Sequence, residues 1–131
     1  MEKNYLNEFK IAEEFLEISK KNLPASLRTS ANRLYSALEK AVIAYFYFKK
    51  IKIPRNHQKL WELSAELLGE NYYSLLRELY DLRMQADYGN TSIFVELSVR
   101  VIIENIEKVK DLIGELKRKI KYKNPERLMK T

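Results

Sequence analysis

Hydrophobic residues recur along this chain every three or four positions, the spacing that places side chains on one face of an α-helix. The pattern is interrupted at Pro24, Pro54, Gly69 and Gly89, and no stretch shows the strict alternation of a strand. Proline ends a helix because it lacks a backbone N–H, and glycine adopts the backbone conformation that follows a last turn. The sequence therefore predicts five helices, over residues 4–21, 26–50, 57–68, 71–87 and 92–122.

The second predicted helix is the candidate for the centre of the fold. It carries apolar side chains on two sides, and a line of small residues between Ala37 and Ala44 lets another backbone approach closely. Ser26 is the expected N-cap of this helix, and Asn56 is the expected N-cap of the helix that follows. A helix that is apolar on two sides normally has neighbours on both.

The last predicted helix carries two sets of branched apolar residues that each repeat every seven positions. The sets are Val95, Ile102, Val109 and Leu116, and Val99, Ile106, Ile113 and Ile120. Heptads of this kind form a coiled-coil-like seam. The Val95–Ile120 seam packs either within the bundle or against a second subunit, and we favour the first alternative because a monomeric bundle also needs such a stripe.

Together these patterns predict an all-α fold, an up-and-down bundle of four main helices plus one shorter helix over residues 57–68. With 131 residues the chain is expected to form a single domain over 1–131, with a basic, frayed tail from about residue 123.

Composition narrows the classes of function. The longest apolar run, from Ala41 to Phe48, is too short to span a membrane, and the first residues lack the order of a signal peptide. The chain has no cysteine and one histidine, and it shows no zinc-type spacing or phosphate-binding glycine loop. We therefore expect a cytoplasmic protein with no membrane association, no metal and no cofactor. The net charge of +6 permits an anionic partner without requiring one.

The segment from Arg83 to Gly89 departs from ordinary core patterning. Arg83 shares a helical face with Leu76 and Leu79, so its side chain is predicted to point into the fold. A guanidinium withdrawn from water needs an acceptor, and Asp87 lies one turn later. Asp87, however, precedes the expected end of its helix, where the helix dipole disfavours an anion. This local conflict indicates a candidate site, and a structural Arg83–Asp87 ion pair is the simpler alternative.

At these residues the chain resembles the HEPN family of small helical proteins from prokaryotic genomes. The likeness is to the branch with an arginine followed by Ala-Asp-Tyr, which here is Arg83 followed by Ala86-Asp87-Tyr88. It extends to Arg33-Leu34-Tyr35-Ser36-Ala37, similar to the family's Arg-x-Tyr-Tyr-Ala stretch, and to His57 at the start of the third helix, and it covers residues 5–116. The resemblance implies a homodimer that acts beside a small nucleotidyltransferase encoded nearby, in a toxin–antitoxin-like or nucleotide-handling module.

The resemblance also raises the question of RNA cleavage. Much of the HEPN family carries an arginine, four to six arbitrary residues and then a histidine, and this pair serves metal-independent ribonuclease activity. Counted from Arg83, the corresponding positions hold Tyr88, Gly89 and Asn90. Tyrosine is poorly matched to proton transfer at neutral pH, so a ribonuclease would need His57 to supply the missing group. The tyrosine that a partner modifies with AMP in some relatives corresponds here to Asn90, so that role does not carry over.

Two further residues have alternative interpretations. His57, beside Arg55 at the predicted start of a helix, is a phosphate-binding candidate because free backbone N–H groups gather there, or else an ordinary capping residue. Arg33 is expected either to join Arg83 and Asp87 in a buried polar network or to form a structural salt bridge to Asp87 or Glu39. The basic run over residues 117–123 either faces solvent or binds nucleic acid.

Three functions are consistent with these residues. The first is a dimeric binding module, with a nucleotide, RNA or partner protein as its ligand. The second is a ribonuclease with a degenerate motif, whose catalytic candidates are Arg83, Asp87 and His57. The third is a purely structural helical dimer. The candidate binding residues are Arg83, Asp87, Tyr88, Arg33, Tyr35 and His57.

Overall fold

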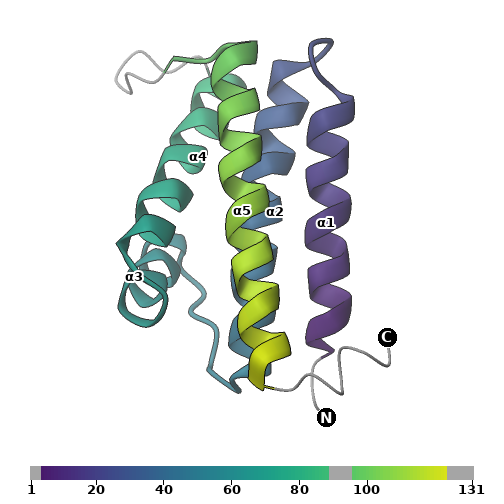
Figure 1. Cartoon of the computed structure of the whole chain (residues 1–131). Helices are drawn as coiled ribbons and strands as arrows, with labels where there is room; N and C mark the ends of the chain where they lie inside the picture. The colour runs from purple at the N-terminus through teal and green to yellow at the C-terminus, as the bar shows by residue number, and fades with distance from the viewer. Residues whose placement is uncertain (1–3, 89–95, 124–131) are drawn as a thin grey trace.

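The computed structural model describes residues 4–88 and 96–123, and all regular structure in this part of the chain is helical. The helices, drawn in Figure 1, are α1 (Tyr5–Lys21), α2 (Leu27–Phe48), α3 (His57–Leu67), α4 (Glu70–Tyr88) and α5 (Val99–Lys123). Four long helices and a short third one confirm the predicted all-α bundle. None of these described helices has an apolar stretch long enough to cross a membrane.

Capping side chains fix where the first three helices begin. Asn4, Ser26 and Asn56 each accept a hydrogen bond from the backbone N–H three residues later, which satisfies a donor that the helix itself leaves unpaired. Ser26 and Asn56 are therefore confirmed as N-caps. Gly69 follows α3 with φ of 127°, a backbone conformation that favours glycine.

The start of α5 differs from the prediction. Residues 96–98 are not helical, and α5 begins at Val99, where the Ser98 hydroxyl accepts a hydrogen bond from the backbone N–H of Val101. The predicted helix is therefore wrong over residues 96–98. Residues 92–95 of the prediction, which include Val95 of the seam, lie outside the described residues. The heptad pattern identifies a buried face, but the first turn is set by the capping serine.

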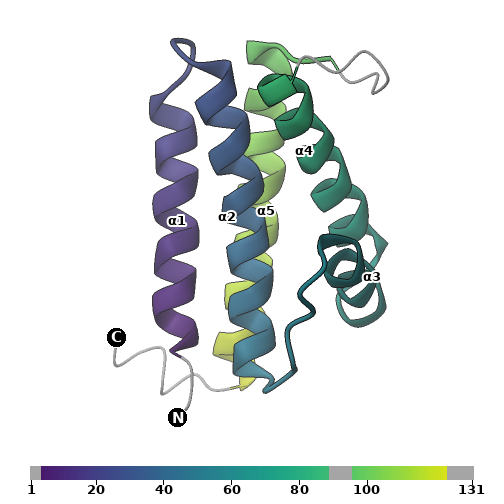
Figure 2. The ribbon, with the colours of Figure 1, turned by 180° about the vertical axis from the view of Figure 1, so that it is seen from behind.

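Helix α2 occupies the centre of the bundle, as its two-sided apolar pattern predicted. It packs against α1, α4 and α5, and Figures 1 and 2 show α1, α2 and α5 side by side while α4 leans away from them. The short α3 packs on the first half of α4. The angle of α4 and the position of α3 define the α2–α3–α4 side of the molecule, where the candidate site lies.

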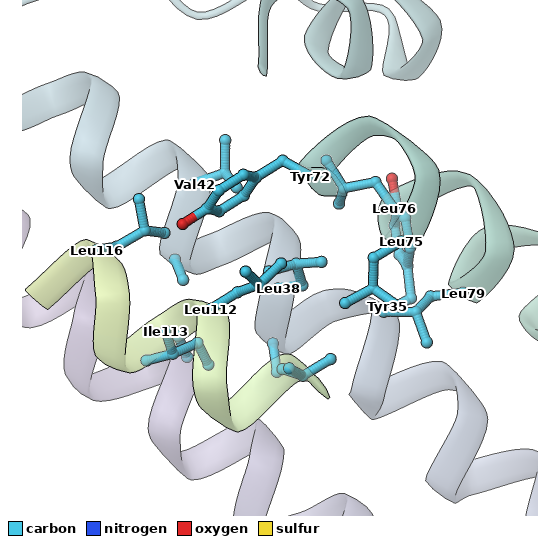
Figure 3. Packing of buried hydrophobic residues seen from close by; sticks show 14 of the residues in the cluster. Tyr35, Leu38, Val42, Tyr72, Leu75, Leu76, Leu79, Leu112, Ile113 and Leu116 are labelled. Atoms are coloured by element: carbon cyan, nitrogen blue, oxygen red, sulfur yellow. The ribbon is translucent and has the colours of Figure 1, made fainter. Parts of the chain in front are cut away.

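The core is built on the inward face of α2. Leu38 and Val42 are fully buried and meet Tyr72 and Leu76 of α4 and Leu116 of α5, as Figure 3 shows. The Tyr72 hydroxyl donates a hydrogen bond of 2.7 Å to Oε1 of Glu115, so its polar end is satisfied although its ring is buried. Truncating a fully buried leucine here would cost about 2–5 kcal/mol.

The predicted seam of α5 is part of this core. Its described members between residues 102 and 120 are at most 6% exposed within the single chain: Ile102, Ile106, Val109, Ile113, Leu116 and Ile120. Side chains buried in the monomer are not available to a second subunit. For residues 102–120 the intramolecular alternative is therefore confirmed, and this part of the seam is not exposed to form the interface of a structural dimer.

Candidate functional site

Arg83 turns inward from α4, as its position on the helical face predicted, and rests on two aromatic rings. Its guanidinium carbon lies 5.6 Å from the ring centre of Tyr35 on α2 and 5.6 Å from that of Tyr80 on α4. The faces of aromatic rings attract cations, so the rings hold the charge in place without neutralising it. Arg83 forms no ion pair with any carboxylate of the described residues. Its N–H edge therefore stays available to an anion.

Tyr35 joins this pair to a hydrogen-bonded network. Its ring is buried, and its hydroxyl donates a 2.5 Å hydrogen bond to Oε2 of Glu39 and accepts one of 3.2 Å from Nε1 of Trp61. Burial raises the pKa of the Tyr35 phenol well above its ordinary range, and the hydrogen bond to Glu39 raises the pKa further. The phenol therefore keeps its proton and acts as a permanent donor to Glu39.

His57, at the first position of α3, reaches the same carboxylate. Its Nδ1 lies 2.8 Å from Oε2 of Glu39 and 3.0 Å from the Tyr35 hydroxyl oxygen. Its ring centre lies 5.4 Å from that of Tyr80 and 5.8 Å from that of Tyr35. The His57 side chain is 47% exposed, so one edge of the ring is held while the other faces solvent.

Arg83 and His57 thus contact the same two tyrosine rings although they come from different helices. A guanidinium offers a planar fork of donors that matches a phosphate, and an imidazole can donate or accept a proton near neutral pH. Three of the predicted binding residues, Arg83, Tyr35 and His57, come together here. We call this group, with Tyr80 and Glu39, the Arg83–His57 cluster.

Asp87 has other partners than the predicted one. Its Oδ1 accepts hydrogen bonds from Nδ2 of Asn32 at 2.8 Å and from Nε of Arg28 at 3.1 Å, both on α2. The bond from Asn32 and the bond and charge of Arg28 hold the pKa of Asp87 below its ordinary value of 3.8, and the charge of Arg83 adds to the effect. The structural Arg83–Asp87 ion pair is therefore wrong: Asp87 ties the end of α4 to the first half of α2.

A comparison with family models adds independent evidence on this chain. The model of the HEPN domain matches residues 7–119, which covers most of the sequence, all of α2, α3 and α4, and most of α1 and α5. The chain belongs to the HEPN family. No curated protein and no solved structure matches it significantly. The Arg83–His57 cluster lies entirely within the matched part of this HEPN domain.

The remaining predicted residues of this HEPN domain lie apart from the cluster. Arg33 is exposed and its guanidinium lies 5.2 Å from the ring centre of Phe15 on α1, so it does not join a network with Arg83 and Asp87. The reason is its direction: Asn32 and Tyr35 face α4, whereas Arg33 faces α1. Tyr88 is 72% exposed at the end of α4. In the basic run, Lys117 is exposed and pairs with Glu13 at 3.1 Å.

Sequence reasoning missed several residues of the site. Glu39 lies one helical turn after Tyr35, and Asn32 one turn after Arg28, so each pair shares a face of α2 that helical spacing identifies. That signal was present in the sequence. Tyr80 lies one helical turn before Arg83 on α4, so helical spacing also identifies that pair, whereas the contacts of Tyr80 with Trp61 and His57 depend on how α3 packs on α4, which no local pattern encodes.

Proposed function

We propose that this HEPN-domain protein binds a phosphate-bearing ligand, a nucleotide or RNA, at the Arg83–His57 cluster. The observation that carries the proposal is the convergence of Arg83 and His57 on the rings of Tyr35 and Tyr80. Both side chains suit phosphate, and neither Arg83 nor the outer edge of His57 is used up by a described partner. The start of α3 adds free backbone N–H groups beside His57.

The electrostatics support an anion at this place. Arg83 carries a charge that the tyrosine faces do not cancel, and its fork can meet two phosphate oxygens at once. The carboxylate of the cluster, Glu39, is occupied by hydrogen bonds from Tyr35 and His57. Its negative charge is therefore partly offset by these two donors.

We extend the proposal to the partner that the family resemblance implies. In this proposal the protein acts as a homodimer beside a small nucleotidyltransferase encoded nearby, in a toxin–antitoxin-like or nucleotide-handling module. Membership of the HEPN family supports this context. The exposed end of α4, with Tyr88, and the exposed Arg28 offer a polar surface next to the cluster for a protein contact.

Replacing Arg83 tests the ligand site. We expect Arg83→Ala to weaken the binding of AMP or of a short single-stranded RNA about tenfold or more, and Arg83→Lys to recover only part of the loss because lysine lacks the planar fork. Isothermal titration calorimetry measures both affinities. Arg77→Ala, which removes an exposed arginine from the same helix, is the matched control. Equal affinity in the wild type and a folded Arg83→Ala variant would refute the proposed site.

A second candidate function, metal-independent ribonuclease activity, is favoured by one specific contact. Glu39 holds His57 at the two tyrosine rings that Arg83 also contacts, although the described residues after Arg83 contain no histidine. We expect purified protein to cleave single-stranded RNA in the presence of a chelator, and both Arg83→Ala and His57→Ala to abolish cleavage. Gel electrophoresis of labelled RNA measures this. Intact RNA with the wild type, or cleavage that survives both substitutions, would leave only the binding function.

A further inference from the structure

The hydrogen atoms shared by Glu39, Tyr35 and His57 can be counted. Oε2 of Glu39 lies within hydrogen-bond distance of both the Tyr35 hydroxyl and Nδ1 of His57. A carboxylate oxygen has only lone pairs to offer, so each of these two contacts is attractive only if the other atom carries a proton. The hydroxyl of Tyr35 has a single proton, and it points to Glu39.

The same count indicates that Nδ1 of His57 carries a proton. Tyr35 cannot donate to Nδ1 as well, because its one proton is used at the shorter contact, and its oxygen already accepts from Trp61. Two lone pairs facing each other across 2.8 Å, one on Glu39 and one on Nδ1, would repel. Nδ1 must therefore be the donor, in the neutral ring as well as in the protonated one.

We infer that Glu39 is a positioning residue that holds His57 in its Nδ1–H tautomer and so leaves Nε2 as the bare nitrogen of the site. The two ring nitrogens point in nearly opposite directions, so an Nδ1 directed at Glu39 and Tyr35 turns Nε2 away from them. His57 is half-exposed, and no described residue occupies this second nitrogen. Free histidine in water prefers the other tautomer, so this state has to be imposed by the fold.

Nε2 of His57 is the atom that contacts the ligand, and this role rests on the proposed function. With neutral His57, Nε2 accepts a hydrogen bond, so the site takes a phosphate compound that also carries a donor, such as a ribose hydroxyl. With protonated His57, the same atom donates to phosphate. In both states Arg83 and Nε2 contact different parts of one ligand, while among the described residues Glu39 is hydrogen-bonded to His57 and Tyr35.

Nitrogen NMR of the chain labelled with 15N-histidine tests the inference directly, because the chain contains a single histidine. For the neutral ring, we expect the wild-type spectrum to show a protonated Nδ1 and a bare Nε2. In the Glu39→Gln variant, a single carbonyl oxygen remains as the acceptor for Tyr35 and His57, and the new amide group can donate a hydrogen bond to Nδ1. The form of His57 with its proton on Nε2 should therefore predominate. Glu62→Gln removes an exposed carboxylate of α3 that bonds Gln58 instead, and should leave the spectrum unchanged.

Binding of AMP to the same proteins separates this inference from the proposed function. We expect Glu39→Gln to weaken AMP binding about threefold to tenfold, the effect of one misdirected hydrogen bond, with Glu62→Gln unchanged. A wild-type ring protonated on Nε2, or a tautomer that Glu39→Gln does not alter, overturns the role of Glu39. The expected tautomer in a protein that binds neither AMP nor RNA upholds the Glu39 contact and overturns the proposed ligand site instead.

Discussion

At the scale of single residues, Arg83 could contact either the carboxylate of Asp87 or aromatic rings, and it contacts the rings. Helical spacing places Asp87 one turn after Arg83, which made an ion pair within α4 the simplest expectation. The structure instead places the guanidinium over Tyr35 and Tyr80, and Asp87 turns to Asn32 of α2. Donors from a neighbouring helix explain how an anion is tolerated near the end of α4, where the helix dipole opposes it.

The contact between Asp87 and α2 predicts a dependence of stability on pH. Its folded pKa lies below the ordinary 3.8, so the unfolded chain binds the proton more tightly than the folded one. The contribution of Asp87 to stability is therefore complete above that value and is lost as the pH falls through the lower, folded pKa. We expect Asp87→Asn to lower the free energy of unfolding by about 1 kcal/mol near neutral pH, and by less in acid.

Urea denaturation of the wild type and Asp87→Asn, at neutral pH and at acidic pH, measures this difference. Asp111→Asn, a substitution at an exposed position of α5, provides a control for the general effect of removing a carboxylate. If the free energy of unfolding of wild type and Asp87→Asn differed by as much in acid as at neutral pH, the side chain would stabilise the fold through its shape and not through its charge.

At the scale of helices, the sequence predicted most of the elements well because capping residues and glycine mark where they begin and end. The observed bounds of α2, α3 and α4 fall within two residues of the predicted ones, since Ser26, Asn56 and Gly69 mark their ends. The start of α5 was placed too early because the apolar repeat continues upstream of Val99 without a break. Periodicity identifies a face, whereas capping identifies an end.

The contacts between α1 and α2 show what local patterns cannot provide. Ser19 and Ser30 are fully buried, and each hydroxyl donates to the backbone carbonyl of the other residue, at 2.8 and 2.7 Å. Each serine reads as an ordinary polar position in its own helix, and only the pairing of the helices gives it a partner. The same limit applies to the candidate site, where Arg83, Tyr35 and His57 were found from motifs but Tyr80 and Trp61 were not.

At the scale of the whole molecule, the apolar stripes of α2 and of α5 between residues 102 and 120 are buried within a single chain. Ile106 is 6% exposed, while Ile103, on the same helix, is 50% exposed. A homodimer of this protein must therefore use surfaces other than the inward face of α5 between residues 102 and 120. The end of α4 near Asp87 and Tyr88 and the α2–α3–α4 side with Arg83 remain available, so the proposed ligand site and a subunit contact can lie side by side.

A pair of substitutions on α5 tests this assignment of faces. Ile106→Asp places a carboxylate in the core without a partner, at a cost of several kcal/mol, which is comparable with the whole stability of a small domain. We expect the variant to lose its helical circular dichroism or to melt far below the wild type. Ile103→Asp makes the same chemical change on the outward face and should melt within a few degrees of the wild type. If Ile106→Asp instead gave a folded monomer from a dimeric wild type, the buried stripe would have to be a subunit interface. Because both variants add the same charge to the same helix, a difference between them can come only from the direction in which the two side chains point.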